Sequence, residues 1–166
     1  MSIQEHGTSA SAGRAAAAPV DRGVTLPVPV YVDDLDGYGM LHHARYAVLL
    51  DHALTDFWVG AGLRLAPDTS VTAVRRLTLS YHEPIRRPGR VDVRMWVTEA
   101  GRTSALYRFE VWSTSAGRDV LHAEAERLVV NLDPATLRPA PFPDDQWRMA
   151  RPLLAPGVER KPSART

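Results

Sequence analysis

Apolar and polar residues alternate along much of the chain with the period of two that is typical of β-strands. The alternation is found in four successive stretches, residues 71–81, 91–98, 105–111 and 123–130. Short turns that contain Gly or Pro separate these stretches, so the pattern predicts an antiparallel meander of four strands. Arg127 interrupts the alternation within the last stretch, which predicts a β-bulge at this position.

The pattern changes to the three-four spacing of an amphipathic helix between His43 and about Gly60. The apolar positions of this stripe are Ala47, Leu50, Leu54, Phe57 and Ala61. Further apolar side chains lie outside the stripe, so we expect most of the helix to be buried. Before the helix, residues 24–32 are rich in β-branched residues and predict one more strand, and the prolines of this stretch favour a sheet edge.

One long helix combined with an antiparallel sheet indicates an α+β fold in which the sheet wraps around the helix. We expect a single domain over residues 24–155, which closes with a short helix between Asp144 and Leu154. Residues 1–23 are rich in Ala, Ser and Gly without periodicity and are predicted to form a disordered tail, as are residues 156–166. The second face and the edges of the sheet need cover, and a second copy of the chain is expected to supply it.

Composition and charge exclude several classes of function. The 166 residues include no cysteine, which excludes a disulfide framework and a thiol nucleophile, and we expect neither a metal nor a cofactor. The formal net charge of +1 provides no general attraction for nucleic acid or for a membrane surface. No apolar run approaches the length of a membrane span and no signal peptide is recognisable, which favours the cytoplasm.

The candidate chemistry lies in the loop before the predicted helix. Residues 34–43 read Asp-Leu-Asp-Gly-Tyr-Gly-Met-Leu-His-His, which places acids, glycines and histidines at one helix N-terminus. A helix N-terminus carries unpaired N–H donors and a partial positive charge, and it can therefore stabilise a developing oxyanion. A carboxylate beside it can attack a carbonyl carbon or activate a water molecule.

Several motifs accompany this loop along the chain. They are Asp34-Leu35-Asp36-Gly37-Tyr38-Gly39 with Tyr46, Tyr81-His82-Glu83-Pro84 with Gly89, Gly101-Arg102-Thr103-Ser104, and residues 138–143. Together they resemble the hotdog-fold acyl-CoA thioesterases, in particular the branch related to 4-hydroxybenzoyl-CoA thioesterase, over about Val24 to Trp147. The family often has His-Val where this chain has Met40-Leu41, and Arg where it has Leu54. The resemblance implies an antiparallel sheet wrapped around a long central helix.

The resemblance also implies roles at the loop. Asp36 falls at the acidic position of the family, which acts as a nucleophile or as a general base, and the residues alone leave both roles open. The backbone N–H of His43 would contact the thioester oxygen. Gly39 would let the backbone approach the carbonyl closely or adopt a positive φ. Asp36 could instead be a turn or cap residue without a catalytic role. For Asp34 this structural role is the favoured one.

Substrate contacts are implied elsewhere in the chain. The candidates are Tyr46, Asp51, Arg86, Arg87, Arg102, Thr103 and Ser104. The turn at residues 102–104 matches one that in the family contacts the pantetheine or nucleotide of CoA across a dimer interface. The arginines at 86 and 87 form a second basic turn, which is a candidate for the same contact. Tyr46 could instead be a plain core residue. Asp51 could have a catalytic role, but a structural hydrogen bond is the favoured role for it.

We therefore expect an acyl thioester hydrolase that acts on acyl-CoA as a homodimer or a dimer of dimers. An acyl-carrier protein is the alternative carrier, because its acidic surface would suit the arginine turns. A non-catalytic hotdog protein that binds an acyl ligand is a further alternative, because Met40 and Leu54 change the polarity near the site.

Overall fold

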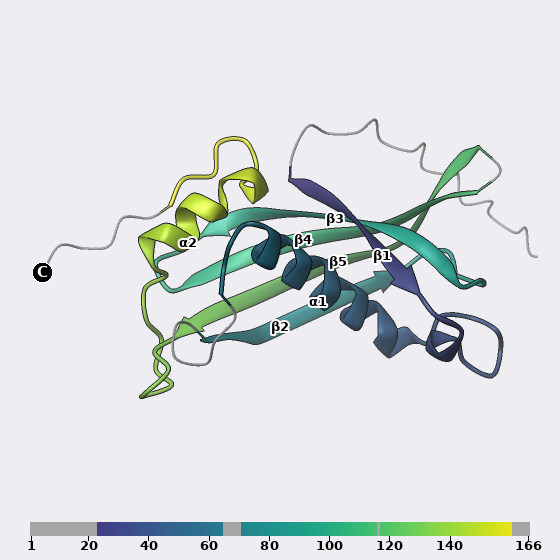
Figure 1. Cartoon of the computed structure of the whole chain (residues 1–166), viewed down its shortest axis with the longest axis horizontal. Coiled ribbons are helices and arrows are strands. Elements are labelled where there is room, and N and C mark those ends of the chain that lie inside the picture. Colours follow the sequence, from purple (N-terminus) through teal and green to yellow (C-terminus); the bar gives the residue numbers. More distant parts are fainter. Residues whose placement is uncertain (1–22, 65–70, 116, 161–166) are drawn as a thin grey trace, which may run out of the picture.

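The computed structural model describes residues 23–64, 71–115 and 117–160. Five strands form one antiparallel sheet in the order β1-β3-β4-β5-β2, and α1 lies against one face of this sheet (Figure 1). The elements are β1 (Val24–Val30), η1 (Val32–Asp34), α1 (His43–Gly60), β2 (Val71–Tyr81), β3 (Gly89–Ala100), β4 (Ser104–Ser115), β5 (Arg118–Leu132), α2 (Asp144–Met149) and η2 (Arg151–Leu153). The α+β architecture predicted from the hydropathy pattern is confirmed.

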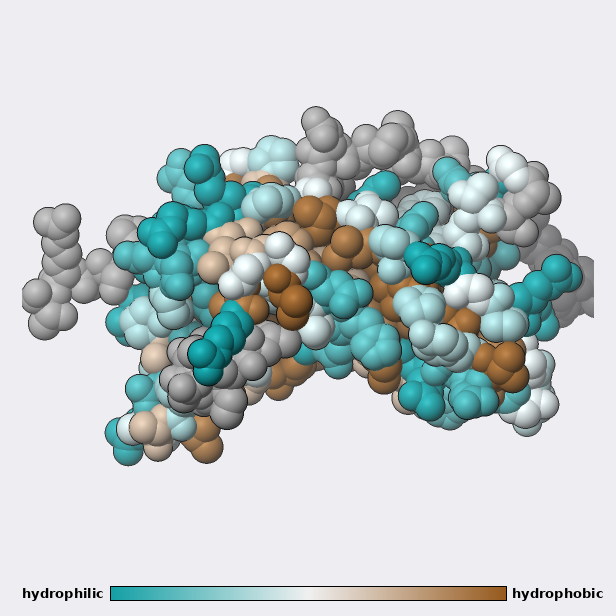
Figure 2. Space-filling model, viewed as in Figure 1, coloured by the Kyte–Doolittle hydropathy of each residue, from teal (hydrophilic) through white to brown (hydrophobic). Residues whose placement is uncertain are grey.

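The hydrophobic core lies between α1 and the inward face of the sheet. Leu49 and Leu50 of α1 pack in this core with strand side chains such as Met95 and Phe109, all of them almost fully buried. Nevertheless only Tyr46, Leu49, Leu50 and Ala53 of α1 are buried, so the expectation of a mostly buried helix is wrong for the protomer. Figure 2 shows the resulting surface, in which apolar patches lie between polar ones on the face that carries α1.

The strand order corrects the predicted four-strand meander. β3, β4 and β5 are consecutive neighbours, but β2 pairs with β5 instead of β3. Residues 82–88 therefore cross from β2, at one edge of the sheet, to the start of β3. The prediction was wrong because alternation determines which face of a strand is buried and leaves its pairing partner open. β1 occupies the other edge beside β3, as its prolines predicted.

The bulge predicted at Arg127 is also corrected. The inward alternation of β5 continues through this residue, with Ala125 and Val129 buried on the same face. Arg127 forms an ion pair with Asp51 on α1, and its side chain is only 13% exposed. Arg127 therefore keeps the alternation of the strand: it points inward, and Asp51 on α1 balances its charge. The pairing of β5 shifts in register at two other points. Against β4 the shift lies between Val111 and Trp112, and against β2 it lies between Val74 and Arg76, beside Leu128.

The C-terminal segment closes one edge of the sheet. The predicted short helix is present as α2 followed by η2. Beyond them, the amide of Ala155 donates to the carbonyl oxygen of Val97 at 3.0 Å, which covers part of the β3 edge that β1 leaves open. Most of the predicted disordered tails, residues 1–22 and 161–166, lie outside the described residues.

Candidate functional site

The loop between η1 and α1 is closed by the side chain of Asp36. Its Oδ1 accepts hydrogen bonds from the backbone amides of Tyr38 at 2.9 Å and Met40 at 3.2 Å. The backbone of Asp36 also donates to the carbonyl oxygen of Met40 at 2.7 Å and accepts from Gly39 at 3.0 Å. These bonds hold the carboxylate in one orientation, and its Oδ2 has no hydrogen-bond partner among the described residues. Gly39 has a φ of 70°, so it adopts the positive φ that was one of the two roles predicted for it.

The first turn of α1 leaves one backbone donor open beside this loop. The amide of Leu41 donates to Ile85 O at 2.8 Å, and the side chain of His42 caps the helix by accepting from the Ala44 amide at 3.2 Å. The amide of Arg45 donates to His42 O. Within the described part of the chain, the His43 amide is left without an acceptor. An unpaired N–H at a helix start is the group that can stabilise an oxyanion.

Asp36 and His43 line the same open pocket of about 330 Å³. The other lining residues are Met40, Leu41, Tyr46, Tyr81, His82, Glu83 and Pro84. Most of these side chains are apolar or aromatic, so the pocket combines a carboxylate and a free amide with a wall that suits an acyl group. The structure thereby brings together three candidates named from the sequence, because Tyr46 lies in the same wall.

Two tyrosines attach the end of β2 to the start of α1. The rings of Tyr46 and Tyr81 meet edge to face with centroids 5.1 Å apart, and the Tyr81 hydroxyl donates to His43 O at 3.1 Å. Burial raises the pKa of Tyr46 above its usual value, and a hydrogen bond with the backbone of Ile85 partly offsets this effect. Tyr46 therefore stays a neutral phenol at ordinary pH and serves both as core residue and as pocket wall.

Sequence reasoning assigned no role to His82, which lines the Asp36 pocket. Its Nε2 lies 2.9 Å from Oε2 of Glu124 on β5, so a carboxylate orients the imidazole. The only signal in the sequence was the motif that contains His82. Its partner is 42 positions away and could not be recognised before the pairing of β2 with β5 was known.

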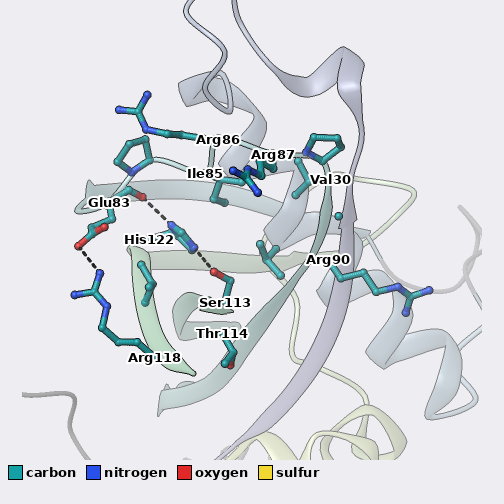
Figure 3. A pocket seen from close by; sticks show the side chains of 15 residues that line it. Val30, Glu83, Ile85, Arg86, Arg87, Arg90, Ser113, Thr114, Arg118 and His122 are labelled. Atoms are coloured by element: carbon teal, nitrogen blue, oxygen red, sulfur yellow. Dashed lines mark hydrogen bonds and ion pairs between the residues drawn. The ribbon is translucent and has the colours of Figure 1, made fainter. Parts of the chain in front are cut away.

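Arg86 and Arg87 follow directly after this pocket wall. They line a second, larger pocket of about 840 Å³ at the start of β3, and this pocket shares Glu83 and Pro84 with the first (Figure 3). The two basic residues predicted at this turn are therefore neighbours of the Asp36 pocket within one protomer.

The other basic turn lies far from Asp36. Residues 101–103 connect β3 to β4, and the strand β3 separates them from the Asp36 end of the sheet, where Gly89 pairs with Val30 (Figure 1). Twelve residues of strand span roughly 40 Å. Backbone bonds hold the turn at its own end, since Arg102 O accepts from Phe142 and Thr103 O from Asn131. Arg102, Thr103 and Ser104 can contact the Asp36 pocket only from another protomer.

Asp51 does not line the Asp36 pocket. It lies on α1, more than two turns beyond His43, where it forms the ion pair with Arg127 of β5. The described residues contain no group of three or more side chains able to hold a metal ion, and none of the described helices is long and apolar enough to cross a membrane. The side of the site that the described residues form combines the Asp36 carboxylate with the open amide at the start of α1.

Known proteins resemble this chain over most of its described length. Residues 38–118 match the model of the Thioesterase superfamily, which covers α1 and β2 to β4. The acyl-CoA thioester hydrolase YbgC of Escherichia coli O157:H7 is 28% identical over 120 residues, 70% of this chain and 87% of YbgC. The hypothetical protein TT1821 from Thermus thermophilus has a TM-score of 0.67 at 28% identity, covering 78% of this chain and 98% of that chain.

Slr0204, a 1,4-dihydroxy-2-naphthoyl-CoA thioesterase from Synechocystis, has a TM-score of 0.69 at 18% identity and covers 78% of this chain and 96% of its own. The last similarity concerns the fold, and it agrees with the arrangement of one long helix on a five-stranded sheet. The family match, the sequence relatives and the fold converge. Over residues 38–118 the chain is similar to the thioesterase superfamily, and it shares the hotdog fold of these solved structures.

Proposed function

We propose that this protein hydrolyses acyl thioesters and that coenzyme A carries the acyl group. One observation carries the proposal: Asp36, which has a free carboxylate oxygen, and His43, which has an open amide, line the same largely apolar pocket. The amide and the helix dipole would stabilise negative charge on the thioester oxygen. The naming of YbgC and Slr0204 as enzymes of CoA thioesters supports the same substrate class.

Asp36 acts in one of two ways in this proposal. As a nucleophile it attacks the carbonyl carbon, expels the thiolate and forms a mixed anhydride that water then hydrolyses. As a general base it takes a proton from the water that attacks the carbonyl directly. Both routes need Oδ2 free, while the two backbone amides on Oδ1 fix the direction in which the carboxylate points.

We further propose that the working unit is a two-fold dimer built through β2. This strand is a sheet edge in the protomer, and it exposes Val74, Leu77 and Tyr81. An edge with open hydrogen-bonding groups and apolar side chains is an unstable surface in water, and pairing with a second copy removes it.

The same dimer would give the distant turn a role. Antiparallel pairing of β2 with its copy sets the start of one strand beside the end of the other. The start of β2 belongs to the end of the sheet that holds the 101–103 turn, because Val71 pairs with Leu132 and Ser104 with Val130. The end of β2, at Tyr81, lines the Asp36 pocket. The partner's turn would thus approach the pantetheine arm of a substrate bound at Asp36.

A thiol-release assay over aryl-CoA and alkanoyl-CoA substrates tests the hydrolase proposal. Asp36→Asn keeps a carbonyl oxygen for the Tyr38 and Met40 amides but removes the charge, so the loop should persist while kcat falls by roughly 10²–10⁴. Asp33→Asn changes a neighbouring exposed acid outside the pocket and should leave kcat unchanged. Equal rates in wild type and Asp36→Asn would refute the assignment of Asp36.

The alternative carrier is tested in the same assay. One acyl group is offered on CoA and on an acyl-carrier protein. A higher kcat/KM on the protein, with strong salt dependence found only there, would replace CoA by the carrier protein. Binding of the thioester without any thiol release would instead favour the non-catalytic hotdog protein.

A further inference from the structure

The large apolar side chains that the protomer leaves exposed are concentrated along β2 and at the two ends of this strand. The middle group is on β2 itself, at positions 74, 77 and 81. At the end of β2, the loop between η1 and α1, which we call the Asp36 loop, exposes Tyr38. At the start of β2, the loop at residues 133–138, which we call the Leu137 loop, exposes Leu137. The other large exposed apolar residues of the described chain are Tyr31 and Val32, just before the Asp36 loop, and Val59 on α1.

The Leu137 loop is held in shape by its own hydrogen bonds. Oδ1 of Asp133 accepts from the amide of Thr136 at 2.8 Å and from its hydroxyl at 2.9 Å. These bonds keep the pKa of the Asp133 carboxyl below its usual value. The amide of Leu137 donates to Asp133 O at 2.8 Å, and the amide of Asp133 donates to Arg138 O at 2.9 Å. The loop is therefore preformed and presents the same tip whether or not a partner is bound.

This loop presents its leucine in an unfavourable way. Leu137 has a φ of 53° and is the only non-glycine residue with a positive φ in the described part of the chain. Glycine and asparagine adopt this conformation more readily than leucine does. The residue is also 63% exposed, so the protomer gains little from its apolar side chain. Neither the backbone nor the packing of the protomer therefore accounts for a leucine at this position, and such strain is typical of functional positions.

Pairing of β2 with a second copy brings the two ends of the strand together. The Leu137 loop lies at the start of β2, because Leu132, which precedes it, pairs with Val71. The Asp36 loop lies at the other end, where Tyr81 lines the Asp36 pocket. Figure 1 shows the two loops at opposite ends of the molecule, both on the side where β2 forms the edge of the sheet. An antiparallel pair of β2 strands sets start against end, so the Leu137 loop of one protomer faces the Asp36 loop of the other.

We propose that Leu137 packs against the partner subunit's Tyr38 and so holds the partner's Asp36 loop in place. This inference rests on the two-fold dimer of the proposed function. Tyr38 is 85% exposed in the protomer, and its amide donates to Oδ1 of Asp36 at 2.9 Å. A contact that fixes Tyr38 therefore also fixes the direction of the carboxylate. Leu137 is a positioning residue for the partner's site, and the two-fold axis gives each of the two sites one such residue.

Cross-linking tests the contact directly, because the chain contains no cysteine that could react in the background. Tyr38→Cys combined with Leu137→Cys, treated with a short bismaleimide, should give a covalent dimer on a denaturing gel. Each single variant should run as a monomer, since the two-fold axis sets each residue beside the other one and not beside its own copy. The matched control is Thr25→Cys with Leu137→Cys, because Thr25 is exposed on β1 at the opposite edge of the sheet. No covalent dimer in the first pair, or an equal yield in the control pair, overturns the proposal.

The dimer dissociation constant separates a contact from a mere turn residue. Leu137→Asn suits the left-handed backbone better than leucine, so a residue that served only the turn would tolerate it. The proposed contact predicts instead that the Kd of the dimer rises by about tenfold or more in analytical ultracentrifugation, because apolar burial is lost. Tyr38→Ser should act similarly, and the two changes together should weaken the dimer little more than either alone, because both remove one shared contact. A Leu137→Asn dimer as tight as wild type, or additive losses, overturns the proposal.

The positioning role has its own readout in the kinetics. At concentrations at which Leu137→Asn is still dimeric, kcat for an acyl-CoA thioester should fall by roughly tenfold with little change in KM, because the carboxylate is less well directed. Leu137→Met keeps an apolar side chain and should restore kcat. An unchanged kcat in the dimeric Leu137→Asn variant, or an equal loss in Leu137→Met, overturns the positioning role.

The contact and the proposed function can fail separately. A covalent dimer of the Tyr38→Cys and Leu137→Cys pair, formed by a protein that hydrolyses no thioester, would refute the proposed function and leave the contact standing. Hydrolysis of CoA thioesters by a protein whose paired variant gives no covalent dimer would refute the contact and leave the hydrolase standing.

Discussion

At the scale of single residues, the conformation of the Asp36 loop depends on one glycine. Gly39 has a φ of 70°, in the left-handed region that glycine adopts without steric cost. A Cβ built on Gly39 would meet no atom within 4 Å, so the requirement for glycine comes from the backbone conformation and not from crowding. Gly37, in the same loop, has equally open surroundings and no positive φ. The two glycines therefore form a natural pair for experiment.

We expect Gly39→Ala to destabilise the protein by about 1–2 kcal/mol, the cost of holding a residue with a Cβ in the left-handed region. The control Gly37→Ala should change the free energy of unfolding by less than about 1 kcal/mol, with a small gain from the stiffer unfolded chain. Urea unfolding monitored by tryptophan fluorescence measures both. Similar losses in the two variants would show that the loop does not depend on the φ of residue 39.

At the scale of elements, a charged pair joins the central helix to the sheet. Asp51 of α1 pairs with Arg127 of β5, whose side chain is mostly enclosed and whose Nε has no hydrogen-bond partner among the described residues. A partly buried guanidinium without its counter-charge destabilises the folded state. Replacing it with an apolar side chain of similar length removes the buried charge and avoids this loss of stability. The pair gives Asp51 a structural role on the helix.

We expect Asp51→Asn to reduce the free energy of unfolding by about 1–2 kcal/mol, a loss moderated by the exposure of Asp51 to water. Arg127→Met should be close to neutral, because it removes the buried charge and keeps the bulk. Chemical denaturation gives both values, and thiol release by the folded variants should stay near the wild-type rate. A fall in kcat for Asp51→Asn comparable to that for Asp36→Asn would instead place Asp51 in the catalytic machinery.

At the scale of the whole molecule, the protomer has one exposed apolar edge. β2 is paired on one side only, and Val74, Leu77 and Tyr81 are 47%, 37% and 49% exposed. The opposite edge carries β1 with its two prolines and the segment that reaches Ala155, so it is less suited to pairing. Antiparallel pairing through β2 would cover this surface and bring a second protomer to each Asp36 pocket.

We expect Leu77→Lys to shift the protein from dimer to monomer in multi-angle light scattering, because it places a charge in the proposed interface. Turnover should fall in parallel, since the partner's turn would no longer reach the substrate. Val59→Lys is the control: Val59 is 54% exposed on α1, away from β2, and the variant should remain a dimer with full activity. A monomeric wild type, or a fully active monomer of Leu77→Lys, contradicts the proposal.

The sequence by itself determined the features that depend on neighbouring positions. The three-four spacing predicted α1 with its start at His43 and its end at Gly60, and the alternation predicted β2 from Val71 to Tyr81. Prolines placed β1 at an edge, because they cannot donate to a strand on both sides. The Asp36 loop was recognisable for the same reason, since the two amides that bind the Asp36 carboxylate lie within four residues of it.

Only the tertiary structure decided which strands are neighbours, and with that which distant side chains meet. The placement of β2 beside β5 brought His82 to Glu124, and the crossing of residues 82–88 brought Glu83 to His122, 39 positions away. It also separated the two basic turns, leaving Arg87 near Asp36 and Arg102 at the far end of the sheet. Local periodicity carries no information about these pairings, because the burial of a strand face is satisfied equally by several strand orders.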